Sequence, residues 1–190
     1  MRSEEGIHPI ENQVNPNGIA AGRIAIVAAE WNSEIVAKLI SGAESAIAAC
    51  ENERISSQLI RVPGSFEIPL ASKFICEAAS REPLNSTSAP LIGVVALGCL
   101  IRGETEHFQL ISNEVSRSLS ALSLQLMIPI GLGVICAYSK SDAEERAGGL
   151  KGNYGEEAAD AVIRMSALRN SLFSSISGEK EGLDKIRAQA

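Results

Sequence analysis

Runs of apolar and β-branched residues alternate along this chain with segments of helical spacing. The runs cover residues 23–29, 57–62, 91–97 and 130–137. Short runs of this kind are typical of strands that are covered on both faces. Because a helical segment separates each run from the next, the order predicts a parallel sheet with right-handed crossovers.

The segments between the runs carry apolar residues at helical spacing. The clearest follows the third run and repeats at intervals of three and four, at Phe108, Ile111, Val115, Leu119, Leu122 and Leu126. An earlier helix is expected after Asn32 and Ser33, which are good N-cap residues. Further helices are expected over 68–79, from a capping box at 141–144 to about 147, and over 156–168.

Four strand–helix units without a Rossmann glycine fingerprint favour a flavodoxin-like, three-layer αβα sandwich with a four-stranded parallel sheet and flanking helices. Its ligand site should lie at the carboxyl ends of the strands. The polar segment 1–21 is interpreted as an arm, 22–170 as the folded domain and 171–190 as a polar, frayed tail. Residues 81–90 are a loop by composition.

Composition narrows the class of protein further. The net charge is −6 and no run of Lys or Arg occurs, which argues against a nucleic-acid partner or an anionic membrane surface. The four cysteines form no CxxC pair, so neither a zinc knuckle nor a disulfide framework is indicated. Segment 91–101 is too short to span a bilayer, and the N-terminus lacks a secretory signal. A cytoplasmic protein is therefore expected.

The most informative stretch is Leu-Gly-Cys-Leu-Ile-Arg-Gly-Glu-Thr-Glu-His-Phe at 97–108, where the third run ends in a glycine turn. Gly103, Glu104 and Thr105 can offer backbone N–H groups to an anion at the mouth of the next helix. Thr105 could equally be an N-cap. Arg146 is either a surface arginine or a second contact for the same anion. His107 is the first candidate for proton transfer near neutral pH, although a structural role is also open.

Other polar and aromatic residues follow the first two runs. Trp31 and Asn32 come after the first, and Ser65, Phe66 and Glu67 come after the second. An aromatic residue at a strand end either caps the core or stacks on a planar ligand, and both roles are open for Trp31 and Phe66. Glu67 either accepts hydrogen bonds from a ligand or complements a helix dipole.

A cysteine nucleophile is a rival hypothesis, with Cys99 attacking and His107 as its base. The Gly-x-Cys-x-Gly elbow is absent, so a small buried hydrophobe is the favoured interpretation of Cys99. A single histidine outside the arm cannot supply the ligand spacing of a metal site, and no metal is expected.

Five ordered segments together resemble the 6,7-dimethyl-8-ribityllumazine synthase family. They are Ala-Glu-Trp-Asn at 29–32, the segments at 61–71 and 97–108, Ala-Glu-Glu-Arg-Ala-Gly-Gly at 143–149 and Lys-Gly-Asn-Tyr-Gly-Glu-Glu-Ala-Ala at 151–159. The resemblance implies condensation of 5-amino-6-(D-ribitylamino)uracil with 3,4-dihydroxy-2-butanone 4-phosphate, without a cofactor. It also implies a homo-pentamer with active sites at subunit interfaces, which in some members assembles into an icosahedral shell.

The resemblance also implies a role for each candidate residue. Trp31 and Asn32 would meet the pyrimidine, and Glu67 a ribityl hydroxyl. The remaining substrate contacts would come from Ser65, Phe66, Leu100, Ile101 and, from the neighbouring subunit, Leu132. The phosphate would be bound by Gly103, Glu104 and Thr105 of one subunit together with Arg146, which would come from the adjacent subunit. His107 would move protons.

Two positions depart from the family pattern. Leu132 stands where an aromatic residue is common, and Tyr154 stands where the family has a lysine. Loss of one charge-assisted contact would cost about 1.5–3 kcal/mol. These departures keep a second hypothesis open, in which the chain is a catalytically decayed homologue that binds flavin or lumazine or forms a shell.

Overall fold

The computed structural model describes residues 21–50, 55–83 and 88–188, with side chains described to residue 173. Its centre is a sheet of four parallel strands in the order β2-β1-β3-β4. The strands are β1 (Gly22–Ala29), β2 (Ile55–Val62), β3 (Leu91–Ile101) and β4 (Ile130–Ala137). The predicted four-stranded parallel sheet and the α/β class are therefore confirmed.

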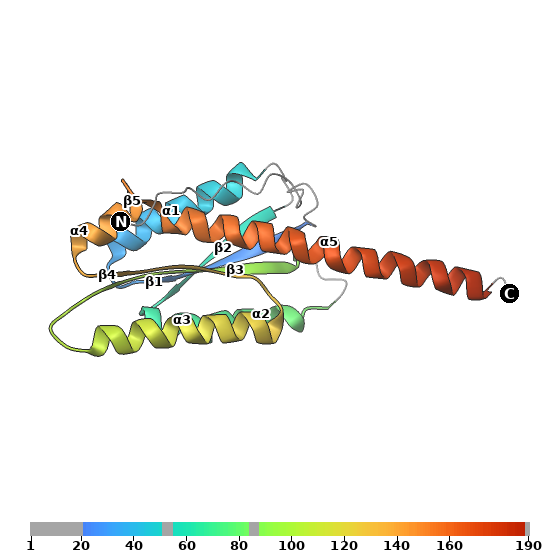
Figure 1. Ribbon diagram of the computed structural model, residues 1–190, viewed down its shortest axis with the longest axis horizontal. Coiled ribbons are helices and arrows are strands. Elements are labelled where there is room, and N and C mark those ends of the chain that lie inside the picture. The colour runs from blue at the N-terminus through green and yellow to red at the C-terminus, as the bar shows by residue number, and fades with distance from the viewer. Residues whose placement is uncertain (1–20, 51–54, 84–87, 189–190) are drawn as a thin grey trace, which may run out of the picture.

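Helices cover both faces of this sheet and complete the three layers (Figure 1). On one side lie α1 (Ser33–Ala49) and α5 (Tyr154–Ala188), and on the other lie α2 (Ile68–Ser80) and α3 (His107–Leu126). The shorter elements are η2 (Ser65–Glu67), α4 (Lys140–Glu145), β5 (Ala147–Gly149) and β6 (Gly152–Asn153).

The core consists of two apolar layers, one on each face of the sheet. In β1, Ile24 and Ile26 belong to the layer under α1 and α5, whereas Ala25 and Val27 belong to the layer under α2 and α3. All four side chains are buried, so the strand needs apolar residues at every position rather than at alternate ones. This two-sided burial explains why the apolar runs of the sequence are continuous.

The helices α1 and α5 approach each other closely at one glycine. A Cβ atom at Gly155 would lie 2.0 Å from the Leu39 carbonyl oxygen, so the two backbones leave no room for a side chain there. Glycine at this position therefore fixes how closely the first turn of α5 packs on α1.

Several element boundaries differ from the sequence prediction. The short helix α4 is capped by Ser139, whose Oγ accepts a hydrogen bond of 3.1 Å from the Asp142 amide, so the predicted capping box at 141–144 is wrong. The predicted helix 156–168 continues to Ala188, which contradicts a frayed tail at 171–190. The tail contains two residues each of Glu, Lys, Leu and Ala, and these residue types favour helix whether or not they bury a face. The predicted arm, 1–21, falls almost entirely outside the described residues.

The described part of the loop 81–90 is anchored to the beginning of β1. Arg23 forms an ion pair of 2.6 Å with Glu82, and its guanidinium also donates to the Ala89 carbonyl. The Arg23 guanidinium holds the pKa of the Glu82 carboxyl below its usual range. Arg23, whose side chain is mostly buried, thus joins both ends of the loop at the edge of the sheet where the strands begin.

None of the helices described is both long enough and apolar enough to cross a membrane. Within the same residues, no group of three or more His, Cys, Asp or Glu side chains is placed to hold a metal ion.

Candidate active site

A cavity of about 390 Å³ opens at the carboxyl ends of β1, β2 and β3. The chain leaves β1 toward β2 on one side and continues with β3 on the other, so this is the point where the strand order reverses. Open α/β sheets bind ligands at such points. The lining residues are Trp31, Asn32, Gly64, Ser65, Phe66, Glu67, Cys99, Leu100, Ile101, Gly103, Thr105, His107, Phe108 and Ile111.

Asn32 joins the turn after β1 to the end of β3. Its side-chain Nδ2 donates a hydrogen bond of 2.8 Å to the Cys99 carbonyl. The residue adopts the left-handed conformation, with φ 55° and ψ 44°, which asparagine tolerates better than most residues. The sequence prediction that Asn32 caps α1 is correct for its position and wrong for its side chain, which forms no capping bond.

Ser65 presents a buried hydroxyl at the cavity. The residue is 4% exposed, and its Oγ has no hydrogen-bond partner among the described residues. A Cβ atom at Gly98 would lie 2.6 Å from this oxygen, so the bare glycine of β3 makes room for it. Because a buried hydroxyl is costly without a partner, Ser65 favours a polar ligand in this part of the cavity.

The side chains of Glu67 and Trp31 both lie close to Gly64. A Cβ atom at Gly64 would lie 2.9 Å from Glu67 Oε2 and 3.7 Å from Trp31 Cδ1. The carboxylate and the indole are therefore near each other on the same side of the cavity. An acceptor beside a flat aromatic face suits a planar, polar ligand that carries hydroxyl or amine donors.

The loop between β3 and α3 forms the end of the cavity. Gly103 and Thr105 line it, and His107 begins α3 at its edge. Glu104 is exposed and does not line the cavity, so its carboxylate is not among the groups that a bound anion would meet there. The N–H groups of the first helical turn point toward this end, which favours an anion.

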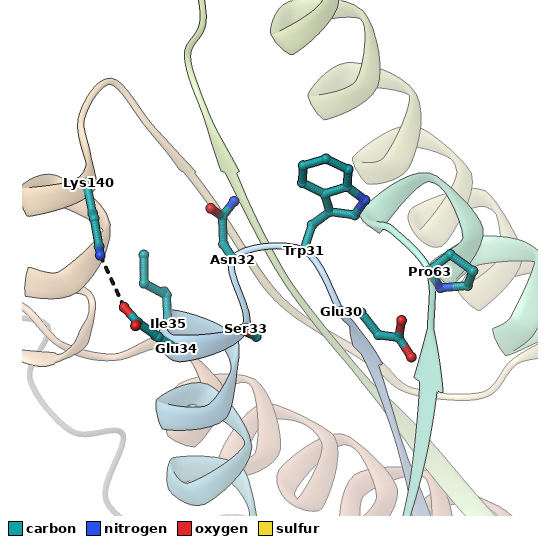
Figure 2. Close-up of a pocket in the computed structure, with 8 residues that line it drawn as sticks. All are labelled: Glu30, Trp31, Asn32, Ser33, Glu34, Ile35, Pro63 and Lys140. Atoms are coloured by element: carbon teal, nitrogen blue, oxygen red, sulfur yellow. Dashed lines mark hydrogen bonds and ion pairs between the residues drawn. The ribbon is translucent and has the colours of Figure 1, made fainter.

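Trp31 and Asn32 also border a second cavity of about 530 Å³ (Figure 2). Lys140 and Glu34, which form an ion pair of 3.1 Å, also line this cavity. Figure 2 shows the indole on the other side of Asn32 from that pair. Trp31 is 74% exposed. This chain therefore covers only part of the Trp31 indole, and the rest of the ring is open to solvent.

Arg146, Leu132 and Tyr154 do not line the cavity of their own chain. The Arg146 guanidinium donates a hydrogen bond of 2.7 Å to the Asp142 carbonyl at the end of α4. Leu132 is half-exposed on the edge strand β4. Tyr154 is half-buried against the core, beside Arg146.

Two aromatic rings in a tilted contact, together with an arginine, extend the wall of the cavity outward. The ring centroids of Phe108 and Tyr138 are 6.3 Å apart, and the Arg102 Cζ lies 5.4 Å from the Tyr138 centroid. Phe108 lines the cavity, whereas Tyr138 and Arg102 are exposed outside it.

Cys99 borders the cavity but its thiol is not poised as a nucleophile. The side chain is buried, and burial raises the pKa of the Cys99 thiol to about 11, with a smaller contribution from Cys136. The reactive thiolate is therefore scarce near neutral pH. This finding disfavours the cysteine-dependent hydrolase hypothesis.

Two lining residues were not among the sequence candidates: Phe108 and Ile111. The helical spacing assigns Phe108 and Ile111 to the core side of α3, and both are indeed partly buried. Their position in the first turns of α3 was the available signal, because those turns directly follow the loop that carries Gly103 and Thr105. Helical periodicity alone cannot separate a core residue from one at a cavity wall.

Comparison with known proteins gives a consistent result. A family model described as 6,7-dimethyl-8-ribityllumazine synthase matches residues 21–170. A protein of that name from Aquifex aeolicus is 43% identical over 150 residues, or 79% of this chain and 91% of the relative. One from Bdellovibrio bacteriovorus is 40% identical over 150 residues, which cover 79% of this chain and 76% of the relative. One from Methylocella silvestris is 38% identical over 149 residues, which cover 78% of this chain and 86% of the relative.

Proposed function

This chain belongs to the 6,7-dimethyl-8-ribityllumazine synthase family, and we propose that the cavity at the ends of β1, β2 and β3 performs the reaction for which the family is named. The chain is accordingly a transferase that condenses 5-amino-6-(D-ribitylamino)uracil with 3,4-dihydroxy-2-butanone 4-phosphate. One observation carries the assignment of the site. Residues from four separate segments, among them Trp31, Ser65, Leu100 and His107, line a single cavity.

The two ends of the cavity suit the two substrates. Trp31 stacks on the pyrimidine, with Asn32 beside it, and Glu67 accepts a hydrogen bond from a ribityl hydroxyl. Backbone groups around Ser65, Phe66, Leu100 and Ile101 bind the remaining polar edges. At the other end, the loop from Gly103 to Thr105 binds the phosphate through its N–H groups.

His107 is the proton carrier. It lines the cavity as the first residue of α3, two positions after Thr105. Imine formation needs a proton for the departing water, and loss of phosphate needs a proton removed from carbon. A histidine at this place can perform both transfers near neutral pH. The rest of the rate enhancement comes from holding two reactive partners in one cavity.

The site is completed by a neighbouring subunit. The open side of Trp31 and the exposure of Phe66 leave room for a second chain. Arg146 reaches the phosphate, and Leu132 covers the pyrimidine, from that neighbour. The protein works as a homo-pentamer in the cytoplasm, acts on small molecules and binds no nucleic acid. Residues 22–170 are its catalytic domain.

The decayed-homologue hypothesis is not favoured. The relatives are named for the enzyme, and His107 and the phosphate loop border the same cavity as Trp31. Leu132 keeps an apolar surface where the family often has a ring. Tyr154 changes a contact without removing Arg146 or His107. Both departures therefore bear on affinity rather than on the reaction.

The first test is enzymatic. The purified chain is given both substrates, and lumazine formation is followed by absorbance and fluorescence against an enzyme-free control. An enzyme-dependent rate is expected. Binding of the pyrimidine without any rate above the control would instead support the binding or shell protein.

Subunit mixing tests the shared site. His107→Ala and Arg146→Ala chains are each impaired as homo-oligomers, and the two are then unfolded together and refolded. If one site takes His107 and Arg146 from different chains, random mixing restores about one quarter of the sites. Activity that stays at the average of the two parents would place both residues in one subunit's site.

A further inference from the structure

We propose that Arg102 is a second cationic contact for the phosphate group, held at the mouth of the cavity by the ring of Tyr138. The inference deepens the proposed function and rests on it, because it concerns the phosphate-bearing substrate of the same site. Arg102 lies in the segment 97–108 but is not among the residues predicted there to contact a ligand, and Tyr138 lies outside every segment singled out in the sequence.

The lining of the cavity includes no permanently charged basic side chain. None of its residues is Lys or Arg, and Glu67 contributes a carboxylate. The Arg146 guanidinium of the same chain is engaged with the Asp142 carbonyl. A dianionic phosphate at Gly103 and Thr105 would therefore meet N–H groups but little charge from this chain. Arg102 is the residue directly before Gly103.

The backbone of Arg102 is fixed where the sheet ends. Its amide donates a hydrogen bond of 2.9 Å to the Ala137 carbonyl, which continues the pairing of β3 with β4 by one residue. Tyr138 follows Ala137 directly. The same bond therefore sets the side chains of Arg102 and Tyr138 next to each other at the mouth of the cavity.

The side-chain geometry leaves the donors of Arg102 free. Its Cζ lies 5.4 Å from the Tyr138 centroid, which is a cation–π contact made by the guanidinium and the ring. The five N–H donors of a guanidinium lie in its plane and are not used by such a contact. The Tyr138 ring in turn contacts the ring of Phe108, a lining residue, in a tilted arrangement with the centroids 6.3 Å apart. The arginine is thus oriented through two rings from the cavity wall.

The charge of Arg102 is also not neutralised by a fixed carboxylate. Ion pairs among the described residues engage Arg23, Arg81, Arg117 and Arg164, and none engages Arg102. The acids nearest in sequence are Glu104 and Glu106, both exposed. An oriented, unpaired guanidinium beside an anion-binding loop is suited to two hydrogen bonds with phosphate oxygens.

The test separates the two substrates of the enzyme. Arg102→Gln should raise the KM for the phosphate-bearing substrate about 10-fold, the equivalent of one charge-assisted hydrogen bond, and leave the KM for the pyrimidine unchanged. Arg102→Lys should give a KM for the phosphate-bearing substrate between those of wild type and Arg102→Gln. Tyr138→Leu should raise the phosphate KM about 3-fold by releasing the guanidinium, whereas Tyr138→Phe keeps the ring and should behave as wild type.

A matched control removes a charge elsewhere. Arg117→Gln deletes an exposed arginine of α3 that pairs with Glu114, and it should leave both KM values unchanged. An equal rise in Arg117→Gln and Arg102→Gln would show a general effect of net charge and overturn the proposal. An unchanged phosphate KM in Arg102→Gln would overturn it directly.

Binding of inorganic phosphate, measured by calorimetry, needs no turnover and keeps this inference separate from the proposed function. Weaker phosphate binding by Arg102→Gln than by wild type supports the contact even if the wild type forms no lumazine. Equal phosphate binding by the two proteins refutes the contact even if the wild type is fully active.

Discussion

The side-chain amide of Asn32 donates a hydrogen bond of 2.8 Å to the Cys99 carbonyl and so ties the turn after β1 to the end of β3. These two strands are neighbours in the sheet, and the cavity lies at their ends. Asn32 and Cys99 both line that cavity. The bond therefore holds the turn that carries Trp31 against the strand that leads to the loop at Gly103 and Thr105.

Two substitutions of Asn32 should distinguish how much its hydrogen bond and its left-handed backbone conformation each contribute to stability. Asn32→Gly keeps a residue suited to φ 55° and loses the bond, which should cost about 0.5–1.5 kcal/mol of unfolding free energy. Asn32→Ala should cost about 1 kcal/mol more, because alanine is strained in the left-handed region. Urea unfolding at one fixed protein concentration measures both. A glycine variant as stable as wild type would show that the bond contributes nothing.

His107→Ala should lower kcat by about 10²- to 10⁴-fold, the range for a general acid–base residue. Residual activity is expected, because the cavity still brings the two substrates together. Steady-state kinetics with both substrates measures the effect, and pyrimidine binding serves as the control for an intact site. A variant with wild-type kcat would remove His107 from the mechanism.

Trp31 is the only tryptophan of the chain, so its fluorescence reports on one place. Addition of the pyrimidine substrate alone should quench it if the two rings stack. Trp31→Ala should raise the KM for the pyrimidine by about 5- to 100-fold, the equivalent of losing one stacked aromatic contact. Trp31→Phe should restore most of the affinity. Equal KM values in the alanine and phenylalanine variants would argue against stacking.

The fold could be predicted because nearly every strand and helix carries a strong local pattern. The run at β4 has the predicted bounds, and the spacing of apolar residues in α3 places Val115, Leu119 and Leu122 in the core. The hairpin of β5 and β6 was missed, since Gly149 and Gly152 give no strand signal and pair only through backbone groups. Periodicity detects elements that bury side chains, and this hairpin buries few.

The site could be predicted only as far as it follows strand ends. Residues at those ends, such as Ser65 and Thr105, line the cavity because parallel strands bring their carboxyl ends to one edge. The side-chain bond of Asn32 to Cys99 could not be foreseen, because it joins groups 67 residues apart in sequence. Partners at that separation are set by the packed sheet and not by local pattern.

The thiol of Cys99 should be inert in the native protein near neutral pH. Its pKa of about 11 lies above the ordinary value of 9.0, so the folded state holds this proton more tightly than the unfolded state does. The associated stability is present below pH 9 and is lost as the pH rises toward 11. Mass spectrometry after iodoacetamide treatment at pH 7.5 should find Cys99 unmodified, with urea-unfolded protein as the control. Rapid native alkylation that abolishes activity would revive the cysteine mechanism.

Gly98→Ala should disturb the cavity through Ser65. The added Cβ would lie 2.6 Å from Ser65 Oγ, and overpacking of this kind costs about 1–3 kcal/mol. The KM for the pyrimidine should rise as the serine is displaced. Adding Ser65→Gly to Gly98→Ala should recover most of the lost stability, and a double-mutant cycle measures the coupling. Additive losses would show that the two positions do not meet.

The contacts of Arg23 with Glu82 and Ala89 have a consequence for how this protein can vary. They close the loop at its two ends, so the number of residues between those ends is not fixed by the rest of the fold. The loop joins the sheet where the strands begin, about 26 Å along an eight-residue strand from the cavity. Insertions there, whether acquired in evolution or engineered as fusions, are separated from substrate recognition by the full length of the sheet.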